Sequence, residues 1–219
     1  MESMNNEGFK IEEVVFHQGG TYASYPRIVS GADSGKLDRW NNIIREDMNK
    51  ILKIYSAYTF TSPPGEQEIF LPDNLRINYE IKLNDKNYLS IFYKADFFSP
   101  YAAYPTQLVY TTNIDMKNDR RLRLSDITDV NQALVDSFTS WEIVDRDKDY
   151  DNYEEYFQAV NDYIAGLGKE ILWMGFQAAD IIGHDNYLEI YSYLTPDRIG
   201  ISISVPHYIG DHVEYEGPR

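Results

Sequence analysis

The sequence contains no cysteine. Disulfide bonds, thiolate zinc sites and cysteine nucleophiles are therefore excluded. No uninterrupted apolar run approaches the ~20 residues that a membrane-spanning helix needs. Residues 1–8 are polar and lack the apolar core of a secretory signal. Two expectations stay open: the protein is cytoplasmic, or it is exported and meets a membrane only through a signal or anchor that lies outside this chain.

Positive charge is also scarce. Lysine and arginine number 20 against 35 aspartate and glutamate residues, which gives a formal net charge of −15. This charge repels phosphate groups, so neither nucleic acid nor an anionic membrane surface is expected as a partner. A cationic partner would be attracted, although many acidic proteins are simply soluble. With 219 residues, 43% of them hydrophobic, the chain can bury a sizeable core.

Recognisable catalytic and metal-binding patterns are missing. The sequence has no Gly-x-Ser-x-Gly elbow and no glycine pattern for phosphate. The acidic segment 145–151 fails as a calcium loop, because Tyr150 stands where glycine is required and Tyr156 where glutamate is required. No metal and no cofactor are expected, since no metal-ligand spacing is shown by the four histidines, His17, His184, His207 and His212. A glycosidase-like pair of carboxylates is possible, but nothing singles out two of them.

Helical periodicity is clearest over residues 33–55, where Asp33 or Ser34 can cap the start. Apolar residues recur there at steps of three and four: Leu37, Trp40, Ile44, Met48, Ile51, Leu52 and Tyr55. A second helix is predicted over 153–167 and a short one over 130–138. Residues 169–179 are apolar and fit either a helix or a strand.

Alternation of apolar and polar residues predicts strands. Residues 75–83, 88–94 and 106–115 are joined in part by short turns, which indicates an antiparallel meander. Two earlier strands are expected over 9–17 and 22–29, the latter broken at Pro26. A hairpin of 186–194 and 199–205 closes the chain, with one face packed and one face open.

These elements predict an α+β fold in which antiparallel sheets are covered by helices. Two interlocked sub-domains are expected. Residues 9–115 would form a helix packed on the antiparallel meander. Residues 116–216 would add further helices and the closing hairpin.

The loop around residues 97–105 is the best candidate for a binding surface, because it concentrates aromatic side chains at one tip. Tyrosine offers rigid contact area together with a hydroxyl group, which is why binding sites favour it. The candidate partner-binding residues are Phe97, Phe98, Pro100, Tyr101, Tyr104 and Pro105. In the alternative interpretation these rings fold back and cover the core.

Several segments together resemble a known family. They are Tyr25-Pro26 followed by the 33–55 helix, the strand pair within 79–93, the run 113–127 that ends in Leu124-Ser125-Asp126-Ile127, and the closing segment 193–209. This combination is similar to the extracytoplasmic domain of the anti-sigma factor RsiV, which also lies beside the catalytic domain of the peptidoglycan deacetylase PdaC. The resemblance implies an α+β fold, a location outside the bacterial membrane and no catalytic activity. The deacetylase domain and its metal motif are missing, so deacetylation is not implied.

One departure concerns the ligand. The family has a Gly-Gly-Ala-His-Gly-like loop after its central strand, where this chain has residues 99–105 without a histidine. The predicted function is a non-catalytic binding or sensor domain that recognises a cell-envelope ligand, either a cationic protein such as lysozyme, as in RsiV, or a cell-wall glycan. The alternatives are a glycan hydrolase with a carboxylate pair in an aromatic-lined cleft, and a purely structural envelope module.

Overall fold

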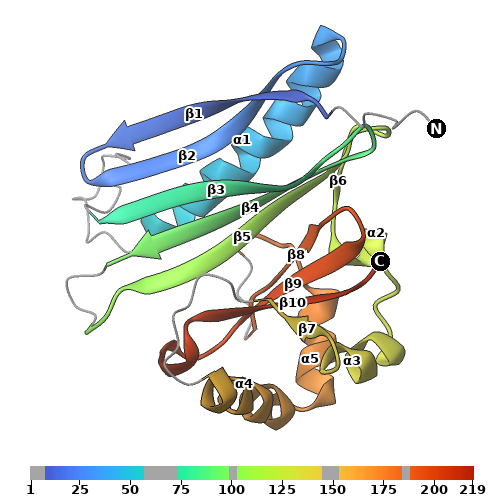
Figure 1. Ribbon diagram of the computed structural model, residues 1–219. Coiled ribbons are helices and arrows are strands. Elements are labelled where there is room, and N and C mark those ends of the chain that lie inside the picture. Colours follow the sequence, from blue (N-terminus) through green and yellow to red (C-terminus); the bar gives the residue numbers. More distant parts are fainter. Residues whose placement is uncertain (1–7, 57–73, 99–102, 145–152, 184–187) are drawn as a thin grey trace.

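The computed structural model describes residues 8–56, 74–98, 103–144, 153–183 and 188–219. Within these ranges, ten strands form two sheets, and helices cover them (Figure 1). The first sheet has the strand order β1-β2-β3-β4-β5-β6 and the second the order β7-β10-β9-β8. This arrangement confirms the predicted α+β fold class.

The first sheet consists of β1 (Lys10–Gln18), β2 (Thr21–Ser30), β3 (Leu75–Asn84), β4 (Tyr88–Phe97), β5 (Thr106–Asp115) and β6 (Arg120–Leu122). The second consists of β7 (Glu142–Ile143), β8 (Ile190–Leu194), β9 (Arg198–Ser204) and β10 (His212–Pro218). The helices are α1 (Ser34–Ser56), α2 (Leu124–Ile127), α3 (Gln132–Phe138), α4 (Tyr153–Leu167), α5 (Lys169–Gln177) and the 3-10 turn η1 (His207–Ile209).

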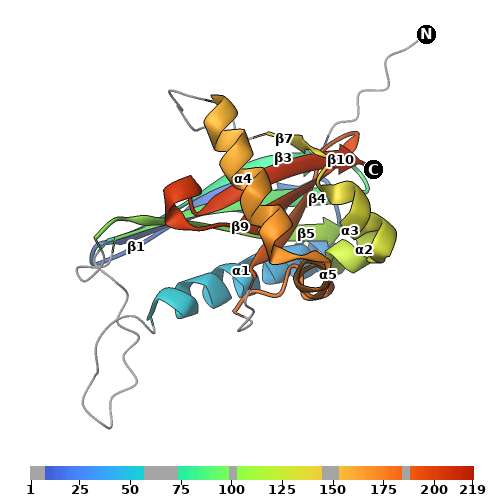
Figure 2. The ribbon, with the colours of Figure 1, turned by 90° about the horizontal axis from the view of Figure 1, so that it is seen from below.

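Helix α1 covers one face of the first sheet, running along one side of the strands (Figure 2). The Asp33 carboxylate accepts a hydrogen bond from the Lys36 amide at 3.0 Å, so Asp33 is the N-terminal cap. The predicted apolar stripe is buried at Trp40, Ile44, Met48, Ile51 and Tyr55. The periodicity therefore identified both the start of the helix and the face that it buries.

The meander of β3, β4 and β5 is antiparallel as predicted. The pairing of β2 with β3, however, is parallel, with Thr21 opposite Leu75 and Ala23 opposite Ile77. Helix α1 lies between these two strands in the chain, as parallel neighbours require a crossover connection. The expected break at Pro26 is wrong: β2 continues to Ser30, because Pro26 lies beyond the last residue paired with β3 and needs no donor on that side.

The closing segment is larger than the predicted hairpin. Strands β8 and β9 form that hairpin, but β10 pairs with β9 along its whole length and β7 pairs with β10. Residues 169–179, which the sequence left ambiguous, begin as helix α5. The expected open face of β9 is wrong, since residues 199–203 are all buried.

Gly200 explains part of that burial. It lies opposite Tyr193 of β8, and the Tyr193 ring covers it so closely that an added Cβ atom would lie 2.0 Å from the ring carbon Cζ. The small residues of β9 therefore make room for aromatic side chains from β8. Tyr191 and Tyr193 in turn join the core of the first sheet.

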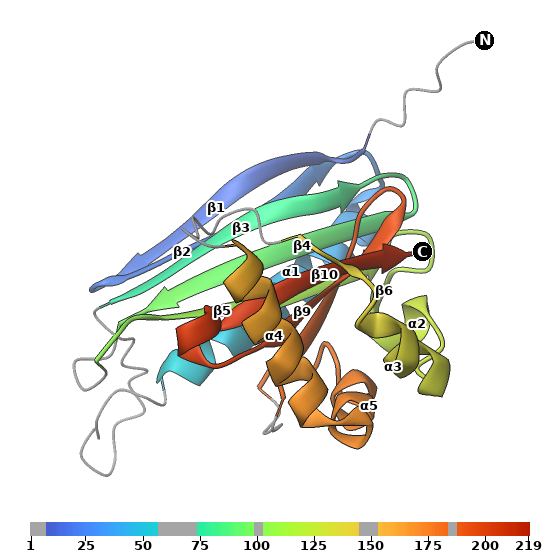
Figure 3. The ribbon, with the colours of Figure 1, turned by 60° about the horizontal axis from the view of Figure 1, so that its bottom comes forward.

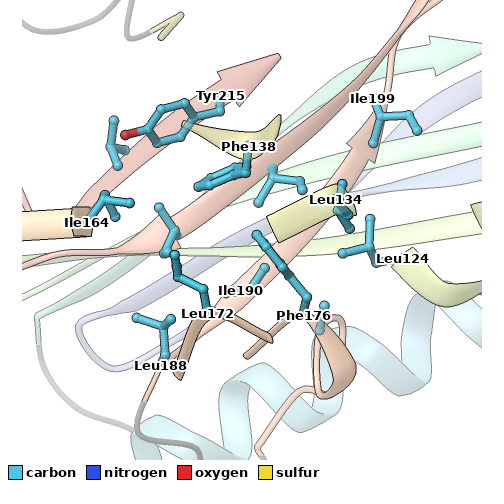
Figure 4. Packing of buried hydrophobic residues seen from close by; sticks show 14 of the residues in the cluster. Leu124, Leu134, Phe138, Ile164, Leu172, Phe176, Leu188, Ile190, Ile199 and Tyr215 are labelled. Carbon is cyan, nitrogen blue, oxygen red and sulfur yellow. The ribbon is translucent and has the colours of Figure 1, made fainter. Parts of the chain in front are cut away.

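Two apolar cores result. The first comprises the apolar residues that α1 and the first sheet bury together, and Tyr191 and Tyr193 of β8 join the same cluster. The second lies between the second sheet and α2–α5, where the Phe138 ring packs against the rings of Phe176 and Tyr215 (Figure 4). The expected boundary at residues 115 and 116 falls in the turn before β6, and β6 belongs to the first sheet. No helix among the described residues is long and apolar enough to cross a membrane.

Asp180 joins the two sheets through a buried hydrogen-bond cluster. Its carboxyl group accepts bonds from the Ser192 amide and hydroxyl, both at 2.6 Å, and from the Leu124 amide at 2.7 Å. The Thr111 hydroxyl lies 3.3 Å away. Burial raises the pKa of Asp180 to about 6, although these donors act in the opposite direction. One side chain thus connects β5, β8 and the start of α2.

This raised pKa predicts a pH dependence of stability. The folded state binds the Asp180 proton more tightly than the unfolded state, whose pKa is 3.8. The stabilisation is therefore complete below pH ~4 and is lost as the pH rises to about 6, by at most about 3 kcal/mol. Urea unfolding across this range measures the free energy of unfolding of the wild type and of Asp180→Asn. The value for the wild type minus the value for the variant should fall as the pH rises.

The comparison with Asp180→Asn is needed because other carboxylates act in the opposite direction. The pKa of Asp126, for example, is lowered by its hydrogen bond from Arg120. Asp129→Asn makes the same replacement at an exposed position and is the matched control, which should have the same pH dependence of stability as the wild type. The prediction is contradicted if the free energy of unfolding of the wild type minus that of Asp180→Asn stays constant or rises with pH.

Candidate functional site

The predicted binding loop divides into a buried part and an exposed part. Phe97 ends β4, and its ring packs against that of Tyr55 with the centroids 5.3 Å apart. It therefore contributes to the first core, as in the fold-back alternative. Phe98 and Tyr104 are 44% and 64% exposed, and Pro105 is exposed. Pro100 and Tyr101 lie outside the described residues.

Tyr104 is held by a partner that the sequence did not indicate. Its ring stacks on the His207 ring with the centroids 5.1 Å apart and the planes 22° apart. His207 begins η1, and the next residue, Tyr208, is 78% exposed. Tyr104, His207 and Tyr208 are here called the aromatic platform. Stacking keeps the Tyr104 ring in place while leaving most of it in contact with solvent.

A network of polar contacts holds the aromatic platform in position. The Asp211 carboxylate lies 3.0 Å from His207 Nδ1 and accepts a hydrogen bond from the backbone amide of Gln107 at 2.9 Å. The Gln107 side chain lies 3.0 Å from His212 Nε2 and donates to Asp96 at 2.7 Å. Strands β4, β5 and β10 therefore share one network, which holds the two chain segments of the platform together.

A second candidate site is the cleft between the two sheets, which sequence reasoning missed. Figure 3 shows β9 and β10 in front of the first sheet. The cleft has a volume of ≈ 570 Å³, a size typical of small-molecule sites. Its lining residues are Glu80, Ile81, Lys82, Lys94, Glu142, Val144, Tyr193, Thr195, Asp197, Arg198, Glu214 and Glu216.

The first-sheet wall of the cleft holds a lysine ammonium. Lys82 Nζ lies 2.8 Å from a Glu80 carboxylate oxygen, and it lies over two aromatic rings, 4.7 Å from the centroid of Phe92 and 5.2 Å from that of Tyr193. At the rim, Arg198 forms an ion pair with Glu142 at 2.5 Å. Both cations thus have carboxylate partners within the cleft.

The opposite wall is acidic. Glu214 and Glu216 share one face of β10, with their Cα atoms ~7 Å apart by the rise of a strand. The Tyr193 hydroxyl donates to Glu216 Oε1 at 3.1 Å. Burial, followed by the charges of Glu214 and Glu216, raises the pKa of Tyr193 far above its usual value, so this hydroxyl stays a donor. The cleft therefore presents closely spaced carboxylates, and beneath it the buried rings of Phe92 and Tyr193 support the Lys82 ammonium.

Among the residues that the structure describes, no three histidine, aspartate or glutamate side chains group closely enough to hold a metal ion. Of the four histidines, His207 and His212 take part in the platform network, and His184 lies outside the described residues. The signal that could have found the platform is the segment Pro206-His207-Tyr208-Ile209, where two polar aromatic residues follow a proline.

Comparisons with known proteins support the fold. No protein-family model matches the sequence, and no curated protein matches it. A crystal structure of a DUF3298 family member from Bacteroides fragilis NCTC 9343 superimposes with a TM-score of 0.53 at 16% identity, covering 98% of this chain and 92% of that one. A DUF3298 family protein from Pseudomonas aeruginosa PAO1 gives 0.46 at 10% identity, covering 97% and 92%.

At this level of identity the likeness shows a shared fold. The chain has the fold of a DUF3298 family protein over nearly its whole length. Its relation to RsiV and PdaC in particular stays a prediction.

Proposed function

We propose that this chain is a non-catalytic binding or sensor domain of a bacterial cell-envelope protein, located outside the cytoplasm, and that the aromatic platform contacts its ligand. The observation that carries the proposal is the arrangement of Tyr104, which is 64% exposed yet held against His207. Exposed aromatic side chains that are fixed before binding lose little conformational freedom on binding. The extracytoplasmic location rests on the resemblance to RsiV and PdaC.

The charge of the chain favours a cationic protein as the ligand. A net charge of −15 accelerates association with a basic partner and is screened by salt. Aromatic anchors then supply contact energy at the centre of such an interface. A lysozyme, which is cationic and acts on the cell wall, fits this chemistry better than a neutral wall glycan does.

The double variant Tyr104→Ala/Tyr208→Ala tests this proposal. We expect the wild-type chain to bind immobilised lysozyme and the variant to bind at least about thirtyfold more weakly, because truncation of a single hot-spot tyrosine costs about 2 kcal/mol or more. Surface plasmon resonance at low and high salt measures both the contact and the electrostatic contribution. Tyr153→Ala, an exposed tyrosine on α4, is the matched control and should bind like wild type.

Other outcomes separate the alternatives. Retention of peptidoglycan fragments in place of lysozyme would make a glycan the ligand of the platform. Release of sugar from those fragments, abolished by Glu214→Gln, would replace the binding function by hydrolysis. The spacing of Glu214 and Glu216 in the cleft is the observation that keeps hydrolysis as the second candidate. An unchanged affinity of the tyrosine double variant would show that the platform is not the contact surface.

A further inference from the structure

The cleft between the sheets carries an excess of negative charge. Its lining includes five carboxylates and three cations, a net charge of −2 at neutral pH. Two of the cations, Lys82 and Arg198, already form ion pairs with lining carboxylates. Lys94 is the third, and whichever carboxylate it faces, two negative charges stay in excess. A cationic occupant would therefore balance the cleft.

The cleft also shows how an ammonium group is stabilised there. The Lys82 side chain is only 17% exposed, and its ammonium is held by the Glu80 carboxylate and by the faces of the Phe92 and Tyr193 rings. A carboxylate combined with aromatic faces is a common way for proteins to recognise organic cations. The geometry around Lys82 therefore shows that this cleft stabilises an ammonium group.

The acidic wall still has acceptors for a second ammonium. Glu216 accepts one hydrogen bond, from the Tyr193 hydroxyl, and a carboxylate has about four acceptor positions. Asp197 is exposed in the turn between β8 and β9, at the edge of the same wall. An ammonium group brings three donors and no acceptor, which suits a wall that presents acceptors.

We propose that this cleft is a binding site for the primary ammonium group of an aliphatic amine, received by Asp197 and by Glu216, which the Tyr193 hydroxyl holds in place. A volume of ≈ 570 Å³ accommodates a flexible amine of several carbon atoms. The amine comes either from a free diamine or from a lysyl side chain of a polypeptide. The site shares no residue with the aromatic platform, so its test is independent of the test of the proposed function.

Calorimetric titration of the chain with 1,5-diaminopentane tests the site, with 1,5-pentanediol as the uncharged analogue. We expect saturable binding of the diamine, none of the diol, and at least about tenfold weaker binding for Glu216→Gln and for Asp197→Asn, because a hydrogen bond to a charged group is lost in each. Asp38→Asn, an exposed carboxylate on α1, removes the same charge elsewhere and should bind like wild type. Nα-acetyl-lysine amide is the second probe.

Binding of the diamine alone assigns the site to a free amine, and binding of the lysine amide assigns it to a polypeptide side chain. The proposal is overturned if neither probe binds, if the diol binds as well as the diamine, or if Asp38→Asn weakens binding as much as the cleft variants do. Asp197 is exposed in a turn, so its variant reports on the site even if Glu216→Gln disturbs β10.

Discussion

Replacing Arg121 by methionine should reduce the free energy of unfolding by about 3 kcal/mol, because it leaves a buried carboxylate without its main partner. Asp47 of α1 is 1% exposed, and the Arg121 guanidinium donates to both of its oxygens, at 3.0 and 2.8 Å. The Thr112 hydroxyl donates a further bond at 3.0 Å. This fork of hydrogen bonds ties α1 to β6 at the edge of the first sheet.

Urea unfolding of single and double variants distinguishes lost pairing from lost packing. Asp47→Leu combined with Arg121→Met removes both charges, and we expect it to be more stable than Arg121→Met alone. Arg123→Met makes the same replacement at an exposed position two residues later and should change stability by less than about 0.5 kcal/mol. A cost for Arg121→Met below about 1 kcal/mol would show that Lys50, 3.5 Å from Asp47, is a sufficient partner.

Gly200→Ala should cost about 2 kcal/mol or more, since the new methyl group would overlap the ring of Tyr193. An added Cβ atom would lie within 2.3 Å of three ring carbons, and Tyr193 is completely buried with its ring edge-on to Phe92. The ring therefore has little freedom to move aside. Thermal and urea unfolding measure the loss.

A double-mutant cycle assigns that cost to the ring. In a Tyr193→Ala background the clash is absent, so Gly200→Ala should be neutral or slightly stabilising. Gly166→Ala is the matched control, because no atom lies within 4 Å of its added Cβ on α4, and it should raise stability by roughly 0.5–1 kcal/mol. An equal penalty for Gly200→Ala with and without the Tyr193 ring would place the strain in the backbone of β9.

The spacing of apolar residues correctly predicted those helices and strands that turn one face to a core along their own length. The apolar stripe of α1 and the alternation in β3 each reflect one face turned to a core, and Asp33 caps the helix through a contact three residues away. Strand β10 also alternates, with Val213 and Tyr215 apolar and Glu214 and Glu216 charged. It was not predicted, because the hairpin before it already accounted for a complete pair of strands. Two-residue β7 has too few residues to show a period.

Features that depend on distant segments were not predictable from local patterns. The parallel pairing of β2 with β3 depends on how the chain returns after α1. The stack of Tyr104 on His207 joins residues about a hundred positions apart, and the cleft exists only because the two sheets lie in a particular relative position. The aromatic composition of the loop did indicate Tyr104, whereas its partner ring belongs to η1 and the acidic wall to β10 of the second sheet.

The sharing of Tyr191 and Tyr193 between the sheets has a consequence for biosynthesis. These two side chains belong to the core of the first sheet but lie about 80 residues after β5 in the chain. During translation the N-terminal half therefore emerges with part of its apolar interior unfilled until β8 has left the ribosome. At 5–20 residues per second this interval lasts several seconds, a period in which a nascent chain is vulnerable to aggregation.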